Sequence, residues 1–369
     1  MSGLADNIMG LARLKQKRDE AIANLAEPFR LKLAAVVATN PGDLRMLTYI
    51  PPGLPPGAPL VVVLHGCTQN AAAYDHGAGW STLAERHGFA LLFPEQQRAN
   101  NPNLCWNWFQ PDDVTAGRGE VESIRQMVLQ ITATHHLDAR RVYITGLSAG
   151  GAMTAAMLAT SPDLFAAGAI IAGLPFGAAS GVMDAMTAMR QPRHHSGHVW
   201  GNLVRAASPY RGPRPAVQIW HGAADATVDP ANAVELAHQW ADVLGLPAAP
   251  ATHHKTDGCR HDVWQEQDGR TTLERWIIPG LDHGTPIRPA ANGATDADQA
   301  VGTPGPHMLA SSVSSTWHLA SSWALLTQPA RPLTASTAAP PAKPALAQLA
   351  TKNAVAIERV LKAAGLLPK

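Results

Sequence analysis

Short apolar runs alternate with longer mixed segments along most of the chain. Runs rich in β-branched and aliphatic residues are typical of strands buried within a sheet, and they occupy residues 47–50, 60–64, 90–94, 142–145, 166–172, 216–220 and 271–278. Helical spacing predicts helices over residues 80–87, 120–135, 151–158, 232–243 and 307–326. This order of strands and helices predicts an α/β fold, with a mostly parallel central sheet and helices on both faces.

The two ends of the chain have a different pattern. Residues 1–40 place apolar positions at helical spacing and predict an N-terminal helical arm; a solvated arm without fixed structure is the alternative. Residues 328–344 are rich in Pro, Ala, Ser and Thr, as linkers are. Residues 345–369 predict a C-terminal amphipathic helix that docks on the body, on a partner or on a granule surface. The main domain is therefore expected within residues 41–327.

The segment around Ser148 has the pattern of a catalytic nucleophile. After the predicted strand at 142–145, residues 146–150 read GLSAG and fit G-x-S-x-G, and a small-residue helix follows. Glycines beside the serine allow a strained turn that holds the hydroxyl at the helix N-terminus, where free N–H groups and the helix dipole stabilise an oxyanion. We interpret Ser148 as a nucleophile; an ordinary Gly-rich turn is the alternative.

Two backbone N–H groups are candidates for the oxyanion hole. In a fold with this kind of strand–serine–helix turn, one donor comes from the residue after the nucleophile and the other from the loop after an earlier central strand. The sequence places Ala149 after Ser148 and the loop HGCTQ after residues 60–64. We assign the donors to Ala149 and Cys67, and we expect His65 to be structural.

The remaining members of a catalytic triad follow later strands. Asp225 comes just after the strand predicted at 216–220, and His283 lies in a glycine-flanked loop after residues 271–278. Asp229 is the rival acid, although Pro230 beside it indicates that it caps the next helix. The chain order Ser148, Asp225, His283 is the one used by the α/β-hydrolase fold.

Two further segments are expected near the site. Residues 100–109 (NNPNLCWNWF) form a polar loop at the end of a strand, so Trp106 or Trp108 is a candidate for the substrate-binding wall. We add Leu147 as a further candidate. The alternative is that both tryptophans only anchor the loop. Residues 174–213 are rich in Gly, Ala and Met and read as a lid. Their histidines, His194, His195 and His198, do not have a metal-ligand spacing, so no metal is expected.

Composition narrows the class of protein. The net charge of +1 gives no reason to expect nucleic acid as a partner, and no apolar run is long enough for an integral membrane span. No signal peptide is evident, so the chain as written is expected in the cytoplasm, or outside it if a signal was removed or is atypical. The 3 cysteines argue against a disulfide framework but leave room for one bridge. The chain has 10 Trp, 6 Phe and 4 Tyr residues. The broad apolar surface of Trp is suited to binding rings, acyl chains or polymers as well as to packing in the core.

Several segments together resemble a known family. LHGCTQ, CWNWF, VYITGLSAGGAMTA, FAAGAIIAGLPFG, IWHGAAD and LDHGTP resemble, in this order, the poly(3-hydroxybutyrate) depolymerase family of α/β-hydrolase esterases, whose relatives include feruloyl and acetylxylan esterases. The resemblance covers residues 47–326 and implies Ser148 as nucleophile, His283 as base and Asp225 as the acid that orients it. It also suggests a disulfide between Cys67 and Cys105.

The expected chemistry is ester hydrolysis through an acyl-enzyme, without metal or organic cofactor. The expected substrates are poly(3-hydroxybutyrate) or short 3-hydroxyacyl oligomers. A feruloyl or acetylxylan esterase acting on plant polysaccharide is the alternative. A non-catalytic protein that binds granules or serves as a scaffold is a remote one.

Overall fold

The computed structural model of the protein describes residues 30–36, 39–289 and 297–326. The predicted N-terminal arm up to residue 29, the linker at 328–344 and the C-terminal helix at 345–369 lie outside the described residues. The described ranges all belong to one unit, residues 29–333.

A ten-stranded sheet crosses this unit. Its strands in chain order are β1 (Lys32–Ala34), β2 (Arg45–Tyr49), β3 (Leu60–Leu64), β4 (Ala90–Glu95), β5 (Val142–Leu147), β6 (Ala167–Ile171), β7 (Ala216–Gly222), β8 (Thr252–Thr256), β9 (Cys259–Gln265) and β10 (Thr271–Ile278). Their spatial order is β1-β2-β4-β3-β5-β6-β7-β10-β9-β8. The pairings are parallel from β4 to β10 and antiparallel at both edges, so β3, β5, β6, β7 and β10 all end at the same side of the sheet.

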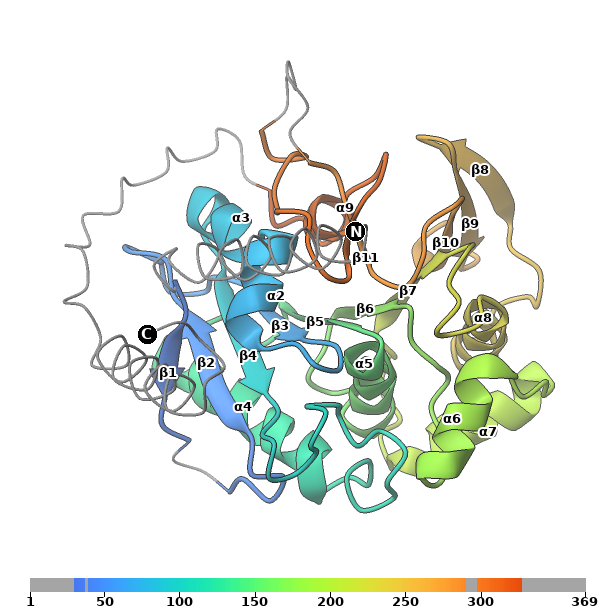
Figure 1. The fold of residues 1–369 in the computed structure, drawn as a ribbon, viewed down its shortest axis with the longest axis horizontal. Helices are drawn as coiled ribbons and strands as arrows, with labels where there is room; N and C mark the ends of the chain where they lie inside the picture. Colours follow the sequence, from blue (N-terminus) through green and yellow to red (C-terminus); the bar gives the residue numbers. More distant parts are fainter. Residues whose placement is uncertain (1–29, 37–38, 290–296, 327–369) are drawn as a thin grey trace, which may run out of the picture. The chain divides into compact units, whose positions relative to one another are not determined.

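Helices cover both faces of the sheet, as predicted (Figure 1). They are α2 (Ala71–Ala78), α3 (Trp80–His87), α4 (Gly119–Thr134), α5 (Ala149–Thr160), α6 (Val182–Arg190), α7 (Gly197–Ala207), α8 (Ala231–Val243) and α9 (Ser315–Ser322). Two short strands, β11 (Thr285–Ile287) and β12 (Met308–Ala310), form a separate parallel pair.

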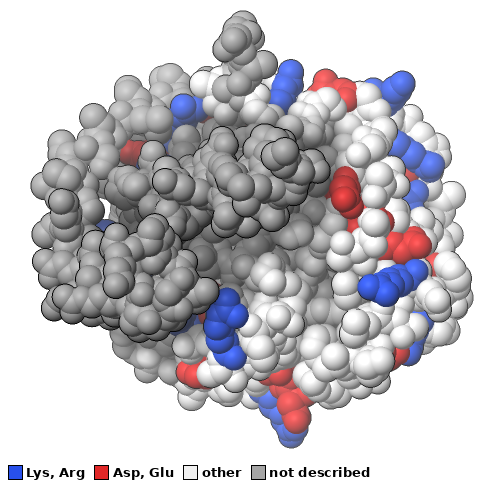
Figure 2. All heavy atoms as spheres, viewed as in Figure 1, with Lys and Arg blue, Asp and Glu red and all other residues white. Residues whose placement is uncertain are grey.

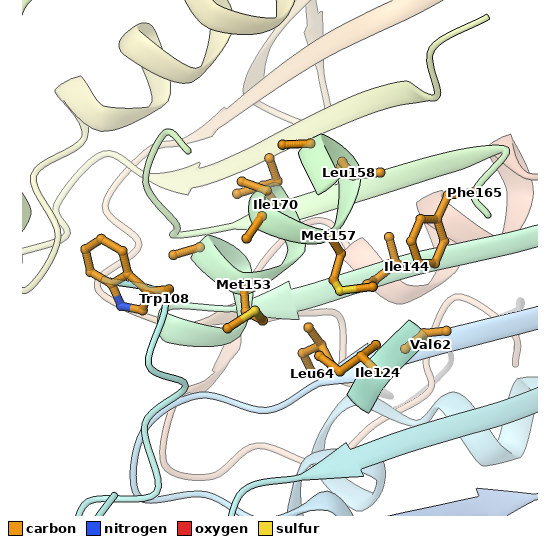
Figure 3. Close-up of a cluster of buried hydrophobic side chains, with 14 of the residues drawn as sticks. Val62, Leu64, Trp108, Ile124, Ile144, Met153, Met157, Leu158, Phe165 and Ile170 are labelled. Carbon is orange, nitrogen blue, oxygen red and sulfur yellow. The ribbon is translucent and has the colours of Figure 1, made fainter. Parts of the chain in front are cut away.

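The apolar run in β3 divides its side chains between two cores. Leu60, Val62 and Leu64 join a cluster with α4, α5, α7 and α8, whereas Val61 and Val63 face a second cluster with α2, α3 and α9. Figure 3 shows part of the first cluster, where side chains of β3 meet those of α4 and α5. A strand with apolar side chains on both faces is therefore the centre of a three-layer α/β fold.

The apolar patterns located the central elements well. The predicted strands at 60–64 and 271–278 and the helix at 80–87 have the bounds found in the structure, and the other central strands and helices differ by a few residues. The nucleophile segment forms the predicted strand, turn and helix, β5 to α5. The fold class predicted from sequence is thus confirmed.

The edges of the fold differ from the prediction. β1 lies within residues 1–40, which we assigned to a helical arm, and it pairs with β2 in the main sheet. The hairpin β8–β9 was not predicted, because β8 reads THHKT and has mostly exposed side chains. The short strands β11 and β12, which follow β10, were not predicted either. The closing helix predicted at 307–326 is limited to α9, because β12 occupies its start.

The predicted lid, residues 174–213, contains α6 and α7, which are fixed to neighbouring elements. The Trp200 indole of α7 donates to Glu235 of α8 at 2.7 Å, and His194 contacts the same carboxylate at 2.9 Å. The Asp229 N–H donates to the Met189 carbonyl of α6 at 2.8 Å. In the described part of the chain, no group of three or more His, Cys, Asp or Glu side chains is arranged to hold a metal ion. A lid role for this segment stays a prediction.

Acidic and basic side chains intermingle on the visible surface of the described residues (Figure 2). This distribution fits the small net charge. None of the helices that the structure describes combines the length and the apolar character needed to cross a bilayer.

Candidate active site

The turn at Ser148 has the strained geometry that the sequence pattern predicts. Ser148 has φ 58° and ψ −118°, directly between β5 and α5. A Cβ at Gly146 would lie 2.3 Å from the Gly150 carbonyl oxygen, and one at Gly150 would lie 2.5 Å from the carbonyl oxygens of Leu64 and His65. Only glycine fits both positions. Such a backbone conformation costs on the order of 1–3 kcal/mol and is retained mainly where it serves a function.

The predicted oxyanion donors have free N–H groups. Within the described residues, the backbone N–H groups of Cys67 and Ala149 donate to no protein acceptor. Ala149 opens α5, so its N–H also carries the positive end of the helix dipole. These two groups are available to an oxyanion, and that role is part of the proposal below.

The loop that carries Cys67 is held from several sides. A disulfide joins Cys67 to Cys105 in the tryptophan loop, 38 residues later, as the family resemblance suggested. The Thr68 N–H donates to the Asn103 carbonyl at 2.7 Å, and the Gln69 side chain accepts from the N–H of residue 66 at 2.8 Å. The two loops therefore form one connected wall.

Asp225 and His283 are hydrogen-bonded, and both are buried. Asp225 Oδ2 lies 2.8 Å from His283 Nδ1, and Asp225 Oδ1 accepts from the N–H groups of Thr227 and Val228 at 2.9 Å each. Burial alone would raise the pKa of Asp225, but hydrogen bonds from His221, His283 and Val228 outweigh it and hold the pKa well below its usual range. The carboxylate therefore stays charged. Because Asp225 contacts Nδ1 of His283, the other ring nitrogen, Nε2, is available to accept or donate a proton.

The histidine loop is fixed to the acid loop. Asp282 Oδ1 accepts from the N–H of His283 at 2.7 Å and from that of Ala226 at 3.3 Å. His307 Nδ1 lies 3.1 Å from the carbonyl of His283. The rival acid, Asp229, accepts from the Ala231 N–H at the start of α8, so it caps that helix as expected.

Ser148, Asp225 and His283 follow the ends of β5, β7 and β10. Because β5, β6, β7 and β10 are consecutive parallel neighbours, these ends lie at one edge of the sheet. Ligand and active sites of open α/β sheets lie at this edge. The topology therefore brings the predicted triad residues to the same side of the molecule.

The three candidate wall residues differ in position. Trp106 is 0% exposed, and its indole N–H donates to the His65 carbonyl at 2.8 Å. Leu147 is 1% exposed and belongs to the core under the turn. The burial of Trp106 and its bond to the loop agree with the alternative that it anchors the loop, and a place for Trp106 or Leu147 in the substrate wall stays a prediction. Trp108 is 9% exposed, close to the 8% of Ser148, and is the most exposed of the three.

A buried carboxyl that sequence reasoning missed supports the tryptophan loop. Glu120 Oε2 accepts from the Asn107 N–H at 2.9 Å, while its Oε1 accepts from the Asn107 and Gln96 side chains. The Gln96 N–H in turn donates to His65 Nε2 at 3.1 Å. Burial, and then the charge of Asp113, raise the pKa of Glu120 to about 8. A glutamate at the first turn of a helix normally reads as a solvated N-terminal charge, so the pattern gave no signal for burial.

Comparison with known proteins decides the family. Residues 44–264 match the profile of the family described as "Esterase PHB depolymerase". This chain belongs to that family. The poly(3-hydroxyalkanoate) depolymerase C of Paucimonas lemoignei is 44% identical over 282 residues, which cover 76% of this chain and 67% of that protein.

Other members of this esterase group are also similar. Feruloyl esterase B of Neurospora crassa is 37% identical over 215 residues, 56% of this chain and 73% of that protein. The solved structure of the acetyl xylan esterase from Aspergillus awamori has a TM-score of 0.64 and 28% identity, covering 69% of this chain and 93% of that one. The chain is a carboxylic ester hydrolase of the PHB depolymerase type.

Proposed function

We propose that this esterase hydrolyses poly(3-hydroxybutyrate) or short 3-hydroxyacyl oligomers, with Ser148, His283 and Asp225 as its triad. The hydrogen bond between Asp225 and His283, at the same edge of the sheet as the strained Ser148 turn, is the observation that carries the chemistry. The similarity to a protein named poly(3-hydroxyalkanoate) depolymerase supports the substrate class.

The proposed mechanism has two acyl-transfer steps. His283 Nε2 takes the proton from Ser148 Oγ as the oxygen attacks the ester carbonyl, and Asp225 holds the ring tautomer and stabilises the imidazolium. The N–H groups of Cys67 and Ala149 stabilise the tetrahedral oxyanion, a contribution of about 3 kcal/mol for one such donor. Collapse releases the alcohol, which takes the proton from His283. Water activated by His283 then releases the acid and frees Ser148.

The second candidate keeps the chemistry and changes the substrate to acetyl or feruloyl esters of plant polysaccharide. The likeness to proteins named acetyl xylan esterase and feruloyl esterase favours it. The two candidates differ in the acyl group, which is a short hydroxyacyl chain in one and an acetyl or flat aromatic group in the other.

A side-by-side assay tests these candidates. Wild type and Ser148→Ala are compared on 3-hydroxybutyrate oligomers, amorphous polymer, acetylxylan and methyl ferulate. We expect release of hydroxybutyrate by the wild type only. Turnover of acetylxylan or methyl ferulate alone would move the chain to the second candidate. Turnover that survives in Ser148→Ala would contradict the triad.

We also propose that the protein works in an oxidising compartment, against the first expectation of a cytoplasmic protein. The Cys67–Cys105 disulfide supports this proposal, because disulfides persist mainly in secreted proteins. Thiol counting on protein isolated from separate cell fractions tests it: one free thiol per chain in an extracellular fraction is expected, and three in a cytoplasmic one would refute it.

Contact of the terminal segments with a polymer granule is a separate proposal, which rests on their sequence alone. Co-sedimentation of the full chain with granules, in the presence of a terminal-segment peptide as competitor, tests it. Displacement by the peptide is expected, and unchanged binding would refute the contact.

A further inference from the structure

The carboxylate of Asp225 has a second histidine beside it. His221, at the end of β7, is fully buried, and its Nε2 lies 3.3 Å from Asp225 Oδ2, the oxygen that also contacts His283. The same Nε2 lies 2.9 Å from the carbonyl oxygen of Val228. One ring nitrogen therefore faces two oxygen atoms of the acid loop.

The surroundings of the ring define its tautomer. Both neighbours of His221 Nε2 are acceptors, so this nitrogen carries the proton. The other nitrogen, Nδ1, is buried and has no hydrogen-bond partner within the described residues. A second proton there would be buried without an acceptor, which is costly. His221 is thus suited to act as a neutral donor.

We propose that His221 is a positioning residue, whose Nε2 proton, shared between Asp225 and the Val228 carbonyl, holds the carboxylate toward His283 and offsets part of its charge. The inference rests on the triad in the proposed function, and it adds a residue that acts only through Asp225. The histidine precedes the acid by four residues in IWHGAAD, a motif to which we gave no role beyond the family resemblance.

The charge balance around the acid gives this role a measurable consequence. Asp225 Oδ2 stabilises the His283 imidazolium, and a donor from His221 competes for the same oxygen. Without that donor, the carboxylate interacts more strongly with His283, so the pKa of the imidazolium rises. In a plot of rate against pH, the loss of activity on the acidic side would then occur at a higher pH.

The other groups facing this cluster can be named. Asp282 accepts from the N–H of His283, and the His307 ring lies 5.8 Å from that of His283. On the neighbouring strand β10, the register partner of His221 is Ile277, an apolar residue. Asp282 and His307 stay unchanged in the variants below, so they do not account for a difference between those variants.

Two substitutions separate the donor from the shape of the ring. His221→Phe keeps a planar ring but has no donor, whereas His221→Gln places an amide N–H near the position of Nε2. We expect His221→Phe to lower kcat about tenfold with KM within about twofold, and His221→Gln to restore most of that loss. The acidic limb of kcat/KM should move to higher pH by roughly half a unit in His221→Phe.

His87→Phe is the matched control. His87 is another buried histidine beside a carboxylate, with Nε2 at 3.0 Å from Asp298, but it lies outside the site. Its loss should lower the unfolding midpoint without moving the pH profile. If His221→Phe behaves in the same way, with activity reduced only as stability falls, His221 has no positioning role.

The proton equilibrium of His283 provides a test that does not depend on turnover. In the Ser148→Ala background, NMR titration of the His283 ring should give a higher pKa when His221→Phe is added and a near-original one with His221→Gln. An unchanged titration would overturn the inference. If the wild type shows no hydrolysis that depends on Ser148, the proposed function fails, while this titration still decides the role of His221.

Discussion

The two sides of the site are held by different means. On the oxyanion side, the Cys67–Cys105 disulfide joins two loops, and the buried carboxyl of Glu120 holds the second of them through Asn107. On the acid–base side, Asp225 and His283 are fixed by hydrogen bonds between neighbouring loops, with Asp282 joining the two. The oxyanion side presents backbone N–H groups, one of them in the loop between β3 and α2, and that loop is anchored by the disulfide. The acid–base side presents side chains at strand ends that the sheet already positions.

Removing the charge of the acid should have the largest effect. Asp225→Asn cannot hold His283 in the required tautomer, and in serine hydrolases with this triad the matching change lowers kcat about 10⁴-fold. Steady-state kinetics on 3-hydroxybutyrate oligomers measures it. Asp229→Asn is the control, which should affect the stability of α8 and change kcat little. Equal losses in the two variants would contradict the choice of acid.

Glu120 should make stability depend on pH. Its pKa is about 8 in the folded protein and near 4.5 when unfolded, so between these values the folded state binds more protons and stability falls as pH rises. The fall is on the order of 4 kcal/mol across that window. Glu120→Gln should flatten the dependence in urea unfolding at a series of pH values.

The control for this change is Glu122→Gln on the same helix, whose carboxyl accepts from the Gln126 side chain at 2.6 Å and is only partly buried. This variant should show the same dependence of stability on pH as the wild type. If the free energy of unfolding of Glu120→Gln still depends on pH as in the wild type, a group other than Glu120 binds the proton.

The disulfide is expected to contribute a similar amount. Because it closes a 38-residue separation, its loss in Cys67→Ala/Cys105→Ala should lower the free energy of unfolding by about 4 kcal/mol. The Cys67 N–H belongs to the backbone and survives the substitution, so any added fall in kcat reports movement of the loop. Cys259→Ala, at the free buried cysteine, is the comparison. A double variant as stable as wild type would argue against the bridge as an anchor.

The smallest effect should be on substrate binding. Trp108→Ala should raise KM for oligomers a few-fold, because the substrate loses its apolar contact area on the indole ring. The change in kcat should be smaller. Trp106→Phe removes the indole hydrogen bond to the loop instead, and should lower stability and kcat while KM stays the same. An unchanged KM in Trp108→Ala would exclude this side chain from the wall.

The predictions from sequence succeeded where one local pattern determines the outcome. Buried strands such as β3 read as apolar runs, and the strained turn at Ser148 needs glycines that the motif displays. The helix α2 was missed although Asn70 caps it, accepting from the Ala73 N–H, because its alanine-rich start lacks an apolar period.

Contacts between distant segments could not be predicted in this way. Glu120 meets Gln96 and Asn107 only after three separate elements have folded, and Asp282 joins two loops 56 residues apart. His221 had a signal, a histidine at a strand end before the acid, but its contact with Asp225 depends on the turn of the acid loop. Side-chain burial likewise separated Trp106 from Trp108, which the sequence left equivalent.

Trapping the nucleophile tests the account most directly. A phosphonate ester that mimics the tetrahedral intermediate is incubated with the protein, and the modified peptide is identified by mass spectrometry. The account predicts one phosphonyl group per chain, on Ser148, with hydrolysis of 3-hydroxybutyrate oligomers lost in proportion to labelling, and no label in Ser148→Ala. Modification of another residue, or full hydrolysis by the labelled protein, would contradict it.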